Sequence, residues 1–206
     1  MTGARGLFLA FEGIDGAGKT THAQALKARL EGIGHPVRYV KEPTEGPWGQ
    51  KVRAIAREGR QGISLDDELE WFIRDREDDV RLNIAPALAR GDVVIADRYF
   101  YSTIAYQSAL GLDPDDIRRR NAAFPVPDLV FLIEISTPLS QVRIVQNRGE
   151  AANPGYEQES YLVRVKRRFD EMTDPNIVRL DGDQDRDTLS EAIWSRVRDL
   201  LDRPDA

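Results

Sequence analysis

The stretch FEGIDGAGKTTHAQAL at residues 11–26 places a glycine-rich loop directly after a short apolar run and directly before a helical pattern. Gly13 to Thr20 matches the pattern G-x-x-x-x-G-K-[ST] at every defined position, in the order of strand, loop and helix that the pattern requires. The glycines allow successive amide N–H groups to point into one concavity, and the following helix adds its positive dipole end. The sequence therefore predicts a loop that binds the phosphates of a nucleotide.

Two side chains of this loop have distinct expected roles. We expect Lys19 to reach the β and γ phosphates, and the hydroxyl of Thr20 to complete the shell of a Mg²⁺ ion that keeps most of its waters. The residues of the loop that we expect to bind ATP are Gly13, Ile14, Asp15, Gly16, Ala17, Gly18, Lys19, Thr20 and Thr21. A glycine-rich turn without a ligand is the alternative, and the complete match makes it the weaker interpretation.

The composition indicates a globular protein. The chain has 206 residues, 41% hydrophobic and 31% charged, and we expect residues 1–206 to form a single domain. Its 29 basic and 35 acidic residues give a net charge of −6, which does not favour a nucleic acid or a membrane as partner. The absence of cysteine excludes disulfides and a cysteine nucleophile. The first apolar run, residues 7–11, is too short for a signal peptide or a membrane span, so we expect a cytoplasmic protein.

Short apolar runs alternate with longer helical patterns along the chain. The runs that we predict as strands are 7–11, 37–40, 93–96, 129–135 and 177–180. The segments that we predict as helices are 19–32, 49–60, 66–90, 100–110, 138–148, 157–173 and 188–201. Several strands are apolar at every position, which is typical of strands covered on both faces. The pattern therefore predicts an α/β fold with a central parallel sheet of about five strands and helices on both faces.

Two segments interrupt this alternation. Residues 41–92 carry more helices than one crossover needs, so we predict a binding lobe there. The segment at about 146–160 includes Gly149, Pro154 and Gly155, and we predict that it forms a small lid.

Polar clusters follow directly on three of the predicted strands: KEP at 41–43, DRY at 97–99 and DGD at 181–183. The carboxyl ends of parallel strands meet at one edge of a sheet, so these clusters should lie beside the phosphate-binding loop. We expect Asp97 to hold the water shell of Mg²⁺ and Arg98 to bind a phosphate through its planar guanidinium. A plain ion pair between these two residues is the alternative, and their place beside the loop favours the functional interpretation.

The predicted helix 66–90 carries an arginine on its apolar face. Phe72 and Val80 belong to an apolar stripe with helical spacing, and Arg76 takes the position between them. Phe72 and Arg76 are neighbours at i and i+4, so the ring could stack on a flat base while the guanidinium hydrogen bonds the edge of that base. Alternatively, Phe72 belongs to the core and Arg76 pairs with an acid such as Asp79. Spacing alone does not choose between the two interpretations.

The stretch DRYFYSTIAYQS at 97–108 predicts a polar helix face beside Arg98. The residues that share this face are Tyr99, Ser102, Thr103 and Tyr106. Gln107 follows Thr103 at i+4, and its amide could meet the edge of a base while Tyr106 closes one side of a sugar. Packing is the usual role of any single tyrosine, but the polar cluster next to a phosphate-binding arginine favours a nucleoside site.

Taken together, these motifs resemble those of thymidylate kinases, the nucleoside monophosphate kinases that make dTDP from dTMP and ATP. The resemblance covers nearly the whole chain. It rests on EGIDGAGKTT, KEP, FIRDR ahead of PAL.RG, DRY..S..AYQ and PDLVFLIEI. It implies the three-layer αβα fold of P-loop NTPases, Mg²⁺ as cofactor, ATP as co-substrate, dTMP as acceptor and a homodimer.

The resemblance also implies roles for single residues. Phe72 would stack on thymine, Arg76 would bond its carbonyl edge and Arg98 would hold the acceptor phosphate. Tyr106 would disfavour a ribonucleotide 2′-hydroxyl. The full set of implied substrate-binding residues is Asp15, Glu42, Phe72, Arg76, Arg98, Ser102, Tyr106 and Gln107. The implied catalytic residues are Lys19, Arg98, Arg148 and Asp15.

The chain departs from the family pattern at three positions. Lys41 stands where the family usually has the arginine of Arg-Glu-Pro, and Gly16 stands where some members carry an arginine inside the loop. Gly155 occupies a lid position that usually offers an arginine. We therefore expect Arg148 to supply the catalytic charge, together with Arg143, which we also place in the ATP site.

Two other functions remain as alternatives. A kinase for another deoxynucleotide or for a deoxynucleoside would keep the loop and the sheet but change the acceptor. A nucleotide-binding sensor with weak catalysis would fit the sparse arginines of the lid. Assays with several acceptors distinguish the first, and tight binding of both nucleotides without product would indicate the second.

Overall fold

The computed structural model describes residues 6–148 and 159–201 of the chain. Its five strands are β1 (Phe8–Glu12), β2 (Val37–Lys41), β3 (Val93–Asp97), β4 (Leu129–Glu134) and β5 (Ile177–Asp181). They form one parallel sheet in the order β2-β3-β1-β4-β5. The predicted α/β class and parallel five-stranded sheet are thus confirmed, and each predicted strand falls on an observed one.

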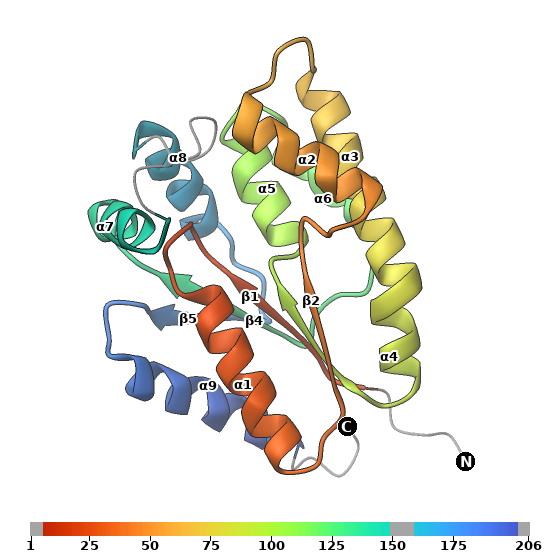
Figure 1. Cartoon of the computed structure of the whole chain (residues 1–206), viewed down its shortest axis with the longest axis vertical. Coiled ribbons are helices and arrows are strands. Elements are labelled where there is room, and N and C mark those ends of the chain that lie inside the picture. The colour runs from red at the N-terminus through yellow and green to blue at the C-terminus, as the bar shows by residue number, and fades with distance from the viewer. Residues whose placement is uncertain (1–5, 149–158, 202–206) are drawn as a thin grey trace.

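Helices cover both faces of this sheet. They are α1 (Lys19–Gly32), α2 (Pro47–Glu58), α3 (Leu65–Asp79), α4 (Ala85–Ala89), α5 (Phe100–Ser108), α6 (Pro114–Asn121), α7 (Thr137–Arg148), α8 (Glu159–Asp170) and α9 (Arg186–Leu201). Figure 1 shows α1 packed beside α9 on one side of the strands, with α5, α6 and α8 on the other. Helices α2 and α3 lie against each other beyond the end of β2 and form the predicted lobe.

The sheet is buried most completely at its centre. All five positions of β1 and of β3 are buried, whereas the edge strands β2 and β5 have exposed positions. Two of the buried positions carry a carboxylate: Glu12 ends β1 and Asp97 ends β3. Because neighbouring parallel strands end at the same edge, both carboxylates lie beside the glycine-rich loop.

The predicted continuous helix 66–90 is wrong in its middle. Helix α3 ends at Asp79, a π-helical turn follows at Val80–Ile84, and α4 begins only at Ala85. Pro86 explains the break, because its ring has no N–H to donate and would clash with the carbonyl of Leu82 in a regular helix. The apolar stripe continues through the break, so its periodicity did not reveal the change.

Helix α6 has no counterpart among the predicted helices. It has a standard start: Asp113 caps the helix by accepting the Asp115 N–H, and Pro114 occupies the first turn. Its apolar stripe is minimal, because Ile117 is the buried aliphatic residue of a helix made mostly of charged residues. The capping signal was therefore present, but the periodicity that guided the prediction was too weak.

Two further observations complete the fold. In the described part of the chain, no helix has the length and apolar character needed to cross a membrane. Of the predicted lid, residues 149–158 lie outside the described residues, between the end of α7 and the start of α8.

Candidate active site

The glycine-rich loop connects β1 to α1 by a sharp turn that glycine makes possible. Gly13 and Gly16 adopt φ angles of 134° and 77°. A Cβ atom at Gly13 would lie 2.4 Å from the carbonyl oxygen of Ile133, and one at Gly16 would lie 2.7 Å from that of Ser140. Any side chain at these positions would therefore strain the loop.

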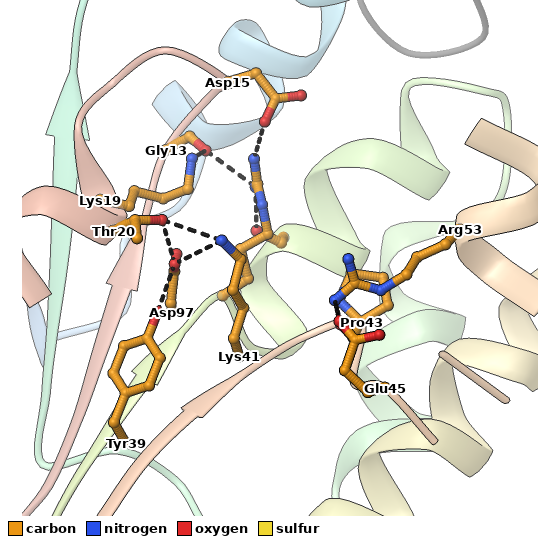
Figure 2. A network of polar contacts seen from close by, with 12 residues as sticks. Gly13, Asp15, Lys19, Thr20, Tyr39, Lys41, Pro43, Glu45, Arg53 and Asp97 are labelled. Carbon is orange, nitrogen blue, oxygen red and sulfur yellow. Dashed lines mark hydrogen bonds and ion pairs between the residues drawn. The ribbon is translucent and has the colours of Figure 1, made fainter. Parts of the chain in front are cut away.

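Lys19 is buried inside the loop that it follows. Its Nζ donates a hydrogen bond to the carbonyl oxygen of Gly13 at 3.0 Å (Figure 2). A second bond, of 2.8 Å, goes to the carbonyl oxygen of Ile14. Burial lowers the pKa of Lys19 to about 7, and the positive charge of Arg98 adds to this shift. The ammonium thus points into the loop's own concavity, where the phosphates of a nucleotide would replace the two carbonyls as partners.

Asp97, at the end of β3, is surrounded by groups from α1 and β2 (Figure 2). Thr20 donates its hydroxyl proton to Oδ2 of Asp97, and the Tyr39 hydroxyl donates to the same oxygen at 3.0 Å. The Lys41 ammonium lies 3.3 Å from that oxygen and donates to the Thr20 hydroxyl at 3.2 Å. Burial raises the pKa of a carboxyl, yet the charges of Lys19 and Lys41 hold the pKa of Asp97 below its ordinary value. Asp97 is therefore ionised at neutral pH.

This cluster has the donor set of a magnesium site in a P-loop protein. A carboxylate and a hydroxyl lie side by side next to the phosphate-binding loop, and Mg²⁺ takes the rest of its shell from water and phosphate oxygens. The Lys41 ammonium already places a positive charge against both groups. The residues present thus fit the cation that the sequence predicts.

Arg98 joins the loop to helix α5. Its guanidinium donates to Asp15 Oδ1 at 2.6 Å, to the Ser102 hydroxyl at 2.8 Å, and to the Tyr106 hydroxyl at 3.3 Å. A further bond of 3.2 Å goes to the carbonyl oxygen of Gly13. Three residues predicted for the acceptor site, Asp15 of the loop and Ser102 and Tyr106 of α5, thus meet around the planar guanidinium of a fourth, Arg98.

Arg76 is fully buried and has three protein partners. Its Nε and Nη2 atoms form a two-pronged ion pair with the carboxylate of Glu42, while Nη1 donates to Asn121 Oδ1 at 2.5 Å. Nη2 also donates to the hydroxyl of Thr103 at 2.9 Å. The acid that pairs with Arg76 is therefore Glu42, 34 residues away in sequence, and the alternative partner Asp79 was wrong.

A cavity of about 680 Å³ links these groups, a size suited to small-molecule ligands. One end is lined by Phe72 and Val52 of the α2–α3 lobe, and the other by Arg143 and Arg186. The phosphate-binding loop and Arg98 lie along its length. One cavity thus joins the phosphate-binding loop and Arg98 to the α2–α3 lobe.

The thymidylate kinase family model matches residues 11–193 of this sequence. The chain belongs to the thymidylate kinase family. It is 46% identical over 199 residues to the thymidylate kinase of Xanthomonas oryzae pv. oryzae (strain PXO99A), which covers 96% of this chain and 86% of that protein. It is 38% identical over 201 residues to the thymidylate kinase of Desulfotalea psychrophila (strain LSv54), covering 98% of both chains.

Several predicted substrate residues of the thymidylate kinase family line the cavity in this chain, and two do not. The lining residues among them are Asp15, Glu42, Phe72, Arg98, Ser102 and Tyr106. Arg76 lies directly behind Glu42 and Thr103, which both face the cavity. Gln107 is fully buried and donates to Glu68 at 2.9 Å, and its Oε1 atom has no hydrogen-bond partner within the described residues.

Tyr39 and Arg53 are polar site residues that the sequence did not single out, and Lys41 was named there only as part of the KEP cluster and as a departure from the family pattern. Tyr39 and Lys41 are two positions apart on β2, so the period of two along a strand would have placed both side chains on the same face. Arg53 of α2 lines the cavity and donates to the carbonyl oxygen of Pro43 (Figure 2). It also donates to the carbonyl oxygen of Thr44. The Glu42–Pro43 peptide bond there is cis.

Of the two arginines predicted for the lid end of the cavity, Arg143 lies among the described side chains and Arg148 does not. Arg143 lines the cavity and donates to the carbonyl oxygen of Gly182 at 3.1 Å. Gln184 lies in the loop after β5, downstream of the DGD motif that marks this strand end, and Arg186 begins helix α9. Helix α7 ends at Arg148, whose side chain is not among those described, and Gly155 also lies outside the described residues.

Proposed function

We propose that the protein transfers the γ-phosphoryl group of ATP to dTMP, giving dTDP and ADP. The observation that carries this proposal is the single cavity in which the phosphate-binding loop and Arg98 lie between an aromatic pocket at Phe72 and the arginines at the other end. Membership of the thymidylate kinase family and the names of the relatives support dTMP as the acceptor.

In this proposal ATP binds along the glycine-rich loop. Its phosphates accept hydrogen bonds from the amide N–H groups of residues 13–21 and from the ammonium of Lys19. Its base lies at the end of the cavity that Arg143 lines. Thr20 and Asp97 would hold a Mg²⁺ ion, partly through water. When bound, this ion neutralises charge on the phosphate oxygens. Tyr39 and Lys41 keep the Asp97 carboxylate oriented and ionised for that role.

The acceptor binds at the opposite end of the cavity. Arg98 holds the dTMP phosphate, and Phe72 stacks on the thymine ring. Asp15 and Tyr106 fix the guanidinium of Arg98 and lie where the deoxyribose would pass. We also propose that the nucleoside is recognised by Arg76, Glu42 and Gln107. Arg76 is linked to the cavity wall by its hydrogen bond to the Thr103 hydroxyl.

The chemistry requires charge neutralisation and alignment. A phosphate monoester has a second pKa of about 6, so the attacking oxygen is already largely deprotonated at neutral pH and needs no general base. Lys19 and Arg98 bring two polyanions together in line and stabilise the charge that spreads over the transferring group. We propose that Arg148 adds a further charge from the lid segment at about 146–160, which would also exclude water.

Further proposals concern the state of the protein in the cell. The resemblance to the family supports a homodimer, and each chain would act as one domain with its own lid. We also propose a cytoplasmic location and neither nucleic acid nor a membrane as partner, as the composition favours.

The first test is ADP production by the purified protein with ATP and Mg²⁺, comparing dTMP with dUMP, dCMP and thymidine as acceptors. We expect turnover with dTMP well above that with the other three. The Lys19→Ala and Arg98→Ala variants should lose most of the activity while remaining folded. Turnover with thymidine in place of dTMP would reassign the acceptor, and binding of both nucleotides without any product would indicate a sensor.

A further inference from the structure

Glu12 caps a helix that belongs to a distant part of the chain. The residue ends β1, its side chain is 0% exposed, and Oε1 accepts the N–H groups of Tyr99 at 2.8 Å and Ser102 at 3.1 Å. Helix α5 starts here, and its own N-cap residue, Tyr99, makes no side-chain cap. Glu12 thus supplies the missing acceptor and places a carboxylate at the positive end of α5.

The residue just before this cap has an unusual backbone. Arg98 adopts a φ of 73°, and it is the one non-glycine residue with a positive φ within residues 6–148 and 159–201. This left-handed conformation is unfavourable for a residue with a side chain, so surrounding contacts must hold it. The Arg98 N–H donates to the carbonyl oxygen of Phe11 at 3.0 Å, and the next N–H, of Tyr99, donates to Glu12. Two consecutive residues of β1 therefore hold two consecutive amides of the turn.

A hydroxyl connects Glu12 to the guanidinium as well. Ser102 has one hydroxyl proton, which it donates to Oε2 of Glu12, so its oxygen is left to accept from Arg98 Nη1 at 2.8 Å. The Glu12 carboxylate thereby sets the direction of the bond that Ser102 makes with Arg98. Glu12 itself does not line the cavity, and its carboxylate is separated from any ligand there by Ser102 and Arg98.

We propose that Glu12 is a positioning residue that holds Arg98, through the backbone and through Ser102, in the orientation that binds the acceptor phosphate. The inference rests on the proposed function of Arg98 as the ligand of that phosphate. This role accounts for the buried carboxylate at the end of β1. Burial raises the pKa of Glu12, and the hydrogen bond from Ser102 and the charge of Arg98 oppose that shift.

The test compares Glu12→Gln with Asp128→Asn. Glutamine keeps the shape and an oxygen for the backbone amides, but it donates to Ser102 and so reverses the bond that directs Ser102 towards Arg98. Asp128 is a matched control, because its carboxylate accepts the N–H of Phe8 at 2.7 Å at the far end of β1. We expect Glu12→Gln to weaken dTMP binding, measured by calorimetry, by about tenfold and to leave ATP binding within about twofold. Asp128→Asn should change neither affinity.

A double-mutant cycle separates positioning from a general loss of structure. In the Arg98→Ala background, Glu12→Gln should have no further effect on the dTMP affinity, because the residue through which it acts is absent. An equal loss of dTMP and ATP affinity, or a full loss that persists in the Arg98→Ala background, would overturn the proposal. If Glu12→Gln does not fold, the same cycle with Ser102→Ala tests the hydroxyl link.

A readout without any nucleotide keeps this inference apart from the proposed function. The NMR signal of the Arg98 Nε–H group in the ligand-free protein should shift in Glu12→Gln and stay in place in Asp128→Asn. An unmoved signal would overturn the role of Glu12 even if the wild-type protein phosphorylates dTMP. A shifted signal in a protein that fails to turn over dTMP would leave the positioning intact and overturn the proposed reaction.

Discussion

Lys19 is hydrogen bonded to the backbone of the phosphate-binding loop. Without a nucleotide, its ammonium donates to two loop carbonyls, and burial together with the charge of Arg98 lowers its pKa to about 7. The carboxylates of Asp15 and Asp97 oppose this shift without cancelling it. In the free protein a substantial fraction of Lys19 is therefore neutral near neutral pH.

The first prediction is that ATP binding takes up protons. The lowered pKa means that the charged form of Lys19 is lost as pH rises through about 7, whereas phosphates bind the charged form and raise its pKa again. At pH 8 the binding heat should therefore depend on the ionisation enthalpy of the buffer, and ATP affinity should fall as pH rises above 7. In the Lys19→Met variant the buffer dependence should vanish. Equal heats in two such buffers for the wild type would contradict the prediction.

Phe72 carries the second prediction. Its ring is half-buried at the wall of the cavity, where a base can stack on it. Replacing an aromatic side chain that stacks on a base costs about 1–3 kcal/mol, so Phe72→Ala should raise the KM for dTMP by about 5- to 150-fold while the KM for ATP stays within about twofold. Trp194→Ala on α9, outside this cavity, serves as the control. An unchanged KM for dTMP in Phe72→Ala would remove this ring from the acceptor site.

The lobe formed by α2 and α3 depends on close backbone packing at its base. A Cβ atom at Gly49 of α2 would lie 2.1 Å from the carbonyl oxygen of Thr44 and 2.8 Å from Oδ1 of Asp75. Thr44 in turn donates its N–H to Asp75 of α3 at 2.7 Å. Helix α2 is therefore fixed to the loop after β2 and to α3 at one point, which sets the distance of Phe72 from the phosphate-binding loop.

We predict opposite effects for two Gly→Ala substitutions. Gly49→Ala forces the backbone contacts apart and should lower the free energy of unfolding by about 3 kcal/mol or more. Gly32→Ala, at the end of α1 with no atom within 4 Å of the added methyl group, should raise it by up to about 1 kcal/mol. Urea denaturation of both variants checks this. A tolerated Gly49→Ala would show that the base of the lobe can move.

The order of strands brings the parts of the site together in one chain. Strands β1 and β3 are neighbours at the centre of the sheet, so the loop after one and the DRY segment after the other lie side by side, and β2 adds Lys41 next to them (Figure 1). The loop after β5 closes the opposite end of the cavity. The phosphate-binding loop, Arg98 and Phe72 thus line one cavity of the chain.

The fourth prediction concerns the assembly. The resemblance to the family predicts a dimer, so sedimentation should give twice the chain mass of 23.2 kDa at micromolar concentrations. Because one chain lines the described cavity, specific activity should stay constant on dilution through the range in which the dimer dissociates. A loss of activity in step with dissociation would mean that the dimer contact supports the site.

The glycine-rich loop, the parallel sheet and the family could be inferred from the chain, because each depends on local signals. The Gly13–Thr20 spacing defines the loop, and apolar runs without a polar alternation define strands that are covered on both faces. Asp97, which ends β3, and Arg98, which follows it, were also predicted correctly to lie at the edge of the sheet. This position follows from the parallel arrangement of the strands alone, because the carboxyl ends of parallel strands lie at the same edge of the sheet.

The partners of the buried charges were decided by long-range packing. No local pattern pairs Arg76 with Glu42 or directs Gln107 to Glu68, because these contacts cross between segments 34 and 39 residues apart. The cap that Glu12 places on α5 has the same origin. The break ahead of Pro86, by contrast, has a local cause that the apolar periodicity did not reveal. The sequence determines which polar side chains the chain contains. A buried charge or amide needs a hydrogen-bond partner, and the tertiary structure decides which residue lies close enough to be that partner.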